Sequence, residues 1–549
     1  MMKRYLKIGG IAVACLLVVL MAIPLFIDVN SFRPKIESEA SSALGRPVNL
    51  GKLSLSVLSG SIGVESISIA DDPAFSKSPF VAAKSLKVDV KMMPLIFHRQ
   101  IEVNGIVLEE PEISLIRSPN GTWNFSSIGG AKSKSASSDS RSAVPQNLSV
   151  GHLEVKDGKV TVAKLQSSAK PQVYDKVNID VKNFSFASRF PFELQATLPA
   201  DGKVELTGEA GPINPANAAA TPLDASVKVT NMNMAASGFV DPASGIAGLI
   251  SLDGKLNSDG TNAKGTGKIT CTNAKLSPRG SPAPKPINIT YAVNTDLIKE
   301  SGTITQGDVL IGKALQHVTG TFQAEGDSQV VNLTVNAPNM PVDDMEAMLP
   351  AFGVILPSGS RLAGVTLSAE LAITGPVDNA VVTGPIRLSN TKLANFDLGA
   401  KLGALQAFTG KVGGSSDTTI QNFSTNARAS ALEGVKADAI NLTIPALGVI
   451  TGAGTVSPAG ELNFRMLANL HGGVAGGLST VALGNSSKGI AFSIQGTASN
   501  PKFIPDVGSV ATGVATSAIQ GALSGKAPGG VSSGVGALGG LLGGKKKGQ

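Results

Sequence analysis

The sequence contains very few cysteines and aromatic residues. Its 549 residues include two cysteines, Cys15 and Cys271, and only 4% of the chain is aromatic, with a single tryptophan. Two cysteines cannot build a disulfide framework or a Cys-based metal site. The apolar content is therefore mainly Ala, Val, Leu and Ile, and stability has to come from the backbone structure and a thin aliphatic layer.

Charged residues are also scarce, at 16% of the chain, against roughly 25% in an ordinary soluble domain. The formal net charge is +7, and most of it lies in two terminal clusters, Lys3, Arg4 and Lys7 and then Lys545, Lys546 and Lys547. The chain between them is nearly neutral and lacks the basic face with interleaved aromatics that nucleic acid requires. Basic ends fit anionic lipid surfaces better.

Residue patterns for catalysis or cofactor binding are missing as well. The four histidines lie far apart without a partner at metal-ligand spacing: His98, His152, His317 and His471. Gly534 to Gly539 match the dinucleotide fingerprint, but they follow no predicted strand and lie too close to the C-terminus for a βαβ unit. No nucleophile elbow or Walker-type loop occurs. The sequence predicts no catalytic residue, no metal and no cofactor.

A long apolar run near the N-terminus is the most informative feature that is present. No charged residue occurs from Ile8 to Ile27, and about 20 apolar residues can cross a bilayer as a helix. Basic residues precede the run, which predicts a cytoplasmic N-terminus and, in a bacterium, a periplasmic remainder. The run is too long for a signal peptide and no small-x-small site closes it, so we predict an uncleaved anchor. Lipidation of Cys15 is the alternative, although Ala12 stands where a large aliphatic is expected.

From Leu53 onward, apolar and polar residues alternate with the period of half-buried strands. Asp-Gly and Asn-Gly pairs between the apolar runs are hairpin signals: Asn120-Gly121, Asp157-Gly158, Asp201-Gly202, Asp253-Gly254 and Asp259-Gly260. Helical patterns are few: one from Ser31 to Gly45, and short ones at 343–349 and 399–408. The sequence therefore predicts a mainly β fold, an antiparallel meander with few short helices behind a single transmembrane helix.

Composition divides the chain into five segments. They are a cytoplasmic stub and transmembrane anchor (1–27), an N-terminal β unit with a leading amphipathic helix (28–130), a Ser/Lys-rich linker (131–145), an extended β body (146–505) and a Gly/Ser/Ala-rich tail with a terminal Lys cluster (506–549). The linker has no apolar period. The tail is expected to be disordered or loosely helical.

Several short motifs follow the anchor in a fixed order. They are Asp28-Val29-Asn30, Phe32-Arg33-Pro34, Leu44-Gly45-Arg46-Pro47-Val48, Asp72-Pro73, Glu110-Pro111-Glu112 and Asn120-Gly121-Thr122-Trp123-Asn124-Phe125. Together they resemble the AsmA-like family of bacterial envelope proteins, most strongly over residues 1–130 and again at 417–469 and 496–501. The resemblance implies an elongated, twisted antiparallel sheet curled into a groove, related to bridge-like lipid transfer proteins, fixed in the inner membrane and reaching toward the outer one.

The resemblance also implies a function without a catalytic step: binding or conducting phospholipids toward the outer membrane, in support of its lipid homeostasis. Such a function is also physically reasonable, because a long meander must bury its apolar face against a second sheet, by barrel closure or against lipid tails. The main alternative is a structural or assembly factor that packs on outer-membrane or periplasmic proteins and influences outer-membrane protein assembly. A secreted adhesin-like protein would require cleavage near residue 25.

Apolar residues of the first strands are the candidates for the lipid-lining floor near the inner membrane: Leu53, Leu55, Val57, Leu86, Val88 and Val90. The alternative is that they pack against other parts of the protein. Trp123 is expected to plug the end of the first sheet, and a position at the groove rim is its alternative.

Overall fold

The structure, a computed structural model, describes residues 28–56, 60–91, 103–119, 122–128, 149–166, 170–214, 220–238, 240, 244–325, 328–401, 416–470 and 489–506. The chain forms two compact units. Unit 1 comprises residues up to 334 together with 347–353 and 374–378, and unit 2 comprises 335–346, 354–373 and the residues from 379 onward.

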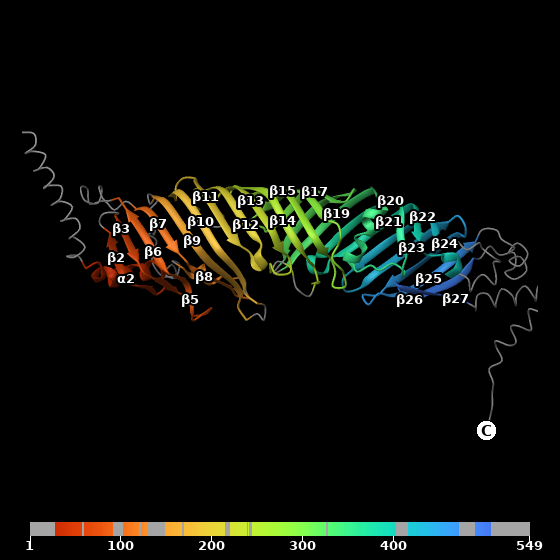
Figure 1. The fold of residues 1–549 in the computed structure, drawn as a ribbon, viewed down its shortest axis with the longest axis horizontal. Helices are drawn as coiled ribbons and strands as arrows, with labels where there is room; N and C mark the ends of the chain where they lie inside the picture. Colours follow the sequence, from red (N-terminus) through yellow and green to blue (C-terminus); the bar gives the residue numbers. More distant parts are fainter. Residues whose placement is uncertain are drawn as a thin grey trace, which may run out of the picture. The chain divides into compact units, whose positions relative to one another are not determined.

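The fold is mainly β with few short helices, as predicted (Figure 1). The strands among the described residues are β1 (Val48–Leu50), β2 (Leu53–Ser56), β3 (Ser61–Val64), β4 (Ile67–Ala70), β5 (Pro79–Ala83), β6 (Ser85–Val90), β7 (Val103–Glu109), β8 (Glu112–Arg117), β9 (Ser149–Lys164), β10 (Gln172–Ser185), β11 (Phe190–Thr197), β12 (Lys203–Ala210), β13 (Leu223–Asn233), β14 (Ala247–Ser258), β15 (Asn262–Lys275), β16 (Ile287–Asp296), β17 (Ser301–Ile311), β18 (Ala314–Glu325), β19 (Ser328–Met340), β20 (Arg361–Pro376), β21 (Val381–Ala394), β22 (Thr418–Ser430), β23 (Gly434–Ile444), β24 (Gly448–Val456), β25 (Glu461–Leu470), β26 (Ile490–Thr497) and β27 (Asn500–Pro505). The helical segments are η1 (Val29–Phe32), α2 (Arg33–Leu44), η2 (Asn124–Ser127), η3 (Pro199–Asp201), α4 (Val342–Glu346), η6 (Leu349–Phe352), η7 (Val377–Asn379) and α5 (Leu398–Lys401).

The sheet of unit 1 begins with two separate series of short strands. One series pairs as β2, β3, β6 and β7, the other as β1, β4, β5 and β8, and both are antiparallel within themselves. Both series end on β9, where β7 pairs with its first half and β8 with its second half, each in parallel. From β9 to β18, each strand pairs antiparallel with the next.

Irregular backbone positions line up where the two series meet. Gly51 N donates to Ser66 O at 2.7 Å, and Glu110 N donates to Lys156 O at 2.8 Å. Glu110, Asp157 and Lys176 all have positive φ, between 46° and 51°. A β-bulge bends the strand that carries it. These aligned irregularities therefore crease the first part of the unit 1 sheet.

Two of the predicted hairpin turns are wrong. Asp157-Gly158 lies inside β9 and Asp253-Gly254 lies inside β14. Asp-Gly indicates a backbone that can take positive φ, and a bulge uses this property as readily as a turn does; Asp157 has φ 49°. Asp201-Gly202 and Asp259-Gly260 do connect strands, whereas Asn120-Gly121 lies outside the described residues.

The predicted leading helix is present as η1 and α2. Asp28 caps η1 by accepting from Asn30 N at 3.0 Å, and Gly45 ends α2 with φ 68°. The predicted segment 343–349 forms α4 and part of η6, and 399–408 begins in α5 while residues 402–408 lie outside the described part.

Side chains of η1 and α2 complete the first edge of the sheet. The Asn30 amide accepts from Leu53 N at 2.8 Å and donates to Leu53 O at 3.2 Å. Glu37 Oε1 accepts from Leu50 N at 2.8 Å, and Ser41 Oγ accepts from Val48 N at 2.9 Å. These backbone groups of β1 and β2 are therefore satisfied without a further strand.

In unit 2, β21 to β27 form an antiparallel meander. Asp506 N donates to Ala491 O at 3.0 Å. Because alternate residues of a strand point their N–H groups to the same side, residues 502 and 504 point theirs toward β26, and 501, 503 and 505 point away. Pro501 and Pro505 have no N–H, so Phe503 offers the single donor on the outer side of β27.

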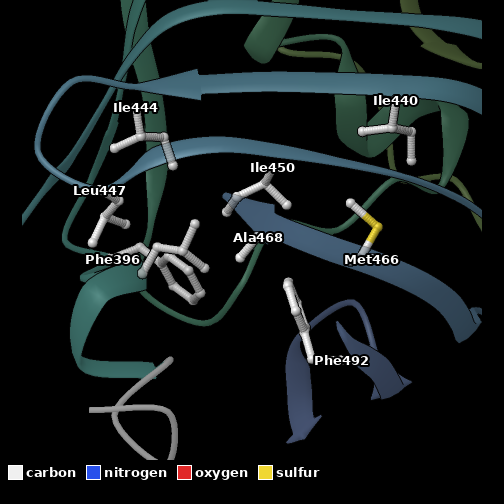
Figure 2. Close-up of a cluster of buried hydrophobic side chains, with 9 residues drawn as sticks. Phe396, Ile440, Ile444, Leu447, Ile450, Met466, Ala468 and Phe492 are labelled. Atoms are coloured by element: carbon white, nitrogen blue, oxygen red, sulfur yellow. The ribbon is translucent and has the colours of Figure 1, made fainter. Parts of the chain in front are cut away.

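Buried side chains form three clusters in the described residues, each beneath a short helical segment. In unit 2, Phe396 lies just before α5 and Leu398 is its first residue. Both belong to the cluster of buried side chains shown in Figure 2. In unit 1, Met348 and Ala351 pack on β15 to β17. At the first edge of unit 1, Val29, Ala40 and Leu44 pack on β1 to β3.

Among the residues that the structure describes, none of the helices has the length and apolar content needed to span a bilayer. The predicted anchor at 1–27, the predicted linker at 131–145 and the tail beyond Asp506 lie outside those residues.

Candidate functional site

The strand register of unit 1 gathers apolar residues on one side of the sheet. Residues paired across neighbouring strands share a face, as do residues two apart along a strand. The pairs connect Leu86 to Leu108, Leu108 to Val155, and Val155 to Ile179. Continued through the later strands, they define what we call the apolar face: Leu53, Val64, Leu86, Leu108, Val155, Ile179, Leu194, Leu206, Val227, Val229, Leu252, Ile269, Ile289 and Val309.

The opposite side of the same strands is polar. In β12, Lys203, Glu205 and Thr207 are exposed, whereas Val204 and Leu206 between them are half-buried. β18 repeats this strict alternation along nearly its whole length. A sheet with one polar and one apolar side needs something to cover the apolar side, whether protein or ligand.

Protein covers the apolar face at two places. At its first edge, η1 and α2 bury Leu53, which is 3% exposed, and Val64. At β15 to β17, the segment 347–353 buries Cys271, Ile287 and Ile311 beside the apolar face, and Leu276 N donates to Ala351 O at 2.9 Å to hold it there.

Between these covers the apolar face stays partly accessible. None of the three buried clusters of the described residues includes the members that lie on β7 to β13. These members are all half-buried: Leu108, Val155, Ile179, Leu194, Leu206, Val227 and Val229. The sheet therefore presents an aliphatic strip over consecutive strands that the described protein does not fully cover.

Tyr291 lies on this side of the sheet, two residues from Ile289. A Cβ at Gly254 would meet the Tyr291 hydroxyl at 2.7 Å, and one at Gly267 would meet it at 3.1 Å. The two glycines therefore leave the room that the tyrosine occupies. Burial raises the pKa of Tyr291, so its hydroxyl stays protonated and can donate a hydrogen bond.

Of the six lining residues predicted from the sequence, the structure brings five together on β2 and β6. Leu53 packs under η1 and α2, and Leu86 packs against the same cluster. Leu55 and Val88 are half-buried and are joined through Ile62, which is 37% exposed. Val90 is half-buried, Val57 lies outside the described residues, and contact of any of these residues with lipid stays a prediction.

Sequence reasoning missed the larger part of the apolar face as a site. The alternation at Ile179, Leu194, Leu206 and Val227 predicts strands, but it does not show that these residues share one surface. A shared face requires the register between strands, and the bulges of β9 and β10 shift this register. The signal that was available is the same period-two pattern that predicted the first six residues.

The motif residues of the N-terminal segment meet in one buried polar network. Arg46, buried at 5% exposure, lies 3.4 Å from Asp71 Oδ1 and donates to the Asn124 carbonyl and to Ser127 Oγ. The Asn124 amide donates to Asp71 Oδ2 at 2.9 Å and to Ser114 O at 2.8 Å. Ser127 Oγ in turn donates to Asp72 Oδ2 at 2.9 Å, so residues from three separate motifs hold β4, β8 and η2 together.

Trp123 lies beside this network. It forms a bridge with Arg117, stacks on Phe125 with centroids 5.7 Å apart, and has the Arg117 guanidinium 6.0 Å from its ring centroid. The only tryptophan of the chain is therefore a reporter of the network's integrity, and its role as a plug stays a prediction.

The network predicts a pH dependence of stability. The Ala74 N–H, the Ser127 hydroxyl and the Arg46 charge lower the pKa of Asp72 from its ordinary value of 3.8. A group with a depressed folded-state pKa stabilises the fold above its unfolded pKa and loses this contribution as pH falls through the folded value. We expect unfolding followed by Trp123 fluorescence to show stability declining below about pH 4, and Asp72→Asn to have a smaller decline. An equal decline in both proteins would assign the effect to other carboxylates.

Titratable groups elsewhere in the described part of the chain sit mostly on the polar side. His152 pairs with Asp180 and His317 with Asp308, each at 2.7 Å; His98 and His471 lie outside that part. No group of three or more His, Cys, Asp or Glu side chains able to hold a metal occurs there. A hollow of about 630 Å³ at the ends of β14 to β18 is lined mainly by polar side chains, and acids such as Asp259 there accept from local turn amides.

An open antiparallel sheet with one polar face and one incompletely covered apolar face defines a class of β protein suited to holding apolar ligands or partners along its strands. The sequence matches the AsmA family over residues 2–437 of the 549-residue chain, and the chain belongs to this family. The family resemblance seen in its motifs is thereby confirmed. A search of curated proteins and a search of solved structures each found no significant match.

Proposed function

We propose that this chain is an inner-membrane-anchored periplasmic protein that binds phospholipid acyl chains on the apolar face of unit 1 and conducts them toward the outer membrane. The accessible aliphatic strip from β7 to β13 is the observation that carries the proposal. Membership of the AsmA family and a large open β-sheet fit a role in lipid transport or envelope assembly.

The energetics favour acyl chains as the occupant. Each methylene group that stays out of water contributes about 0.8 kcal/mol of favourable free energy. A lipid that leaves the bilayer for water loses this contribution for every methylene of its acyl chains. Neighbouring strands lie ~4.8 Å apart, so an acyl chain that moves along the aliphatic strip meets a new aliphatic side chain at each strand. Movement along it then needs no aqueous intermediate, and the headgroup can stay hydrated at the margin of the sheet because burying a charge is costly.

The placement in the envelope rests on the uncharged run from Ile8 to Ile27 and the basic residues before it. In this proposal the creased sheet curls around the acyl chains, and the exposed polar side of β12 and its neighbours faces the periplasm. No catalytic step is required for this function.

Site-specific photocrosslinking in living bacteria tests the proposal with the full chain. A benzophenone amino acid replaces Leu206, and the matched control replaces Glu205, the adjacent residue on the opposite face. We expect a phosphate-labelled lipid adduct at position 206 and little or none at position 205. Equal labelling at both positions, or none, would contradict the proposal, and a protein adduct at position 206 would favour the assembly-factor alternative.

A further inference from the structure

Helix α2 and the preceding turn η1 have an inner and an outer side. The inner side is fixed to the sheet by the hydrogen bonds of Asn30, Glu37 and Ser41 and by the packing of Ala40 and Leu44. The contacts that fix η1 and α2 to the described sheet therefore lie on this inner side, and the outer side faces away from them.

The outer side exposes two large apolar side chains next to each other. Phe32 is 56% exposed and Ile36 is 44% exposed. Residues four apart on a helix are neighbours, so these two make one continuous apolar flank. On the other exposed flank of the same helix lie Ser38 and Ser42, so the exposed surface is divided into an apolar and a polar flank.

The position of this flank in the chain identifies its partner. The uncharged run ends at Ile27, directly before Asp28, which caps η1. Five residues can extend at most roughly 18 Å, so Phe32 cannot lie far from the end of that run. On the same helix Arg33 lies 3.5 Å from Glu37, and Lys35 and Glu39 are both exposed. These charges balance, so the exposed aromatic and aliphatic side chains are the feature that fits a bilayer interface.

We infer that the flank formed by Phe32 and Ile36 docks on the phospholipid bilayer that holds the N-terminal run. The inference rests on the membrane anchoring in the proposed function, but it does not depend on lipid conduction. Interfacial helices bury their apolar side chains by about 5–10 Å. Docking in this way sets α2 between the bilayer and the first edge of the apolar face.

Tryptophan substitutions in the full chain test this docking. The protein is reconstituted into vesicles of phosphatidylethanolamine and phosphatidylglycerol that contain lipids brominated on the acyl chain. Phe32→Trp and Ile36→Trp report the docking flank, and Ser38→Trp is the matched control on the same helix. Wild-type fluorescence supplies the contribution of Trp123, the only natural tryptophan.

We expect the bromolipids to quench the added tryptophan at positions 32 and 36 roughly twofold more strongly than at position 38, because only the docked flank reaches the acyl region. Equal quenching at all three positions in protein that floats with the vesicles would overturn the docking and leave the anchoring intact. Protein that fails to float with the vesicles would overturn the anchoring and the docking together.

Discussion

Replacing Leu206 by aspartate is expected to stop lipid from passing along the apolar face of unit 1. Leu206 lies in β12 between Leu194 and Val227, in the part of the strip that is accessible. Because the side chain is half-buried, a carboxylate there can remain hydrated and the sheet can still form. An acyl chain that passes it must desolvate the charge, which costs several kcal/mol, so passage should fall about tenfold or more.

Lipid adducts on both sides of the substitution measure this effect. A photocrosslinker at Val155 samples the strip before Leu206, and one at Leu252, which belongs to none of the buried clusters, samples the apolar face after it. With Leu206→Asp, labelling at Val155 should persist and labelling at Leu252 should fall. Thr207→Asp adds the same charge on the exposed opposite face and should change neither. Unchanged labelling at Leu252 would show that lipid does not travel along this face.

Arg46→Ala is expected to destabilise the N-terminal part of unit 1 by about 3–5 kcal/mol, because removing one partner of a buried ion pair leaves the other charge buried and uncompensated. Asp71 would keep the Asn124 amide and its own backbone contact with Asp72 N at 2.7 Å, but no cation. Urea unfolding followed by Trp123 fluorescence measures the change, since Trp123 adjoins Asn124.

A surface pair supplies the control for Arg46. Arg33 lies 3.5 Å from Glu37 within α2, and its side chain is 45% exposed. Exposed pairs of this kind typically contribute less than about 1 kcal/mol, so Arg33→Ala should leave the Trp123 transition nearly unchanged. A loss below about 1 kcal/mol for Arg46→Ala would mean that the network does not hold β4, β8 and η2 together.

The alternation of apolar and polar residues was sufficient to predict the mainly β fold, because a period of two is a local property of a half-buried strand. The pairing of β7 and β8 with β9 was not predictable in this way. It is parallel and joins strands separated by the undescribed segment 129–148, and periodicity contains no information about partners. The Asp-Gly pair within β9 predicted a hairpin turn for a related reason, since a bulge and a turn both use residues that tolerate positive φ.

The candidate site shows the same division between local and distant information. Leu53 and Leu86 were predicted to line the site. In the structure η1 and α2 cover Leu53, and Leu86 packs against the same buried cluster, whereas nothing in the strand of Leu53 indicates a helix above it. Met348 and Ala351, which cover β15 to β17, come from a distant part of the chain. In contrast, the motif containing Arg46 and the motif containing Asn124 indicated the family correctly, and only the structure shows that they meet in one network.

The outer side of β27 has few N–H donors, and this affects how copies of the protein interact in a crowded compartment. A strand with a full row of unpaired N–H groups can template the addition of strands from other molecules, which is how cross-β fibres grow. With Pro501 and Pro505 on either side of Phe503, an incoming strand would find one donor where it needs several. Within the described part of the chain, the outer side of β27 is therefore a poor template for strands from other copies.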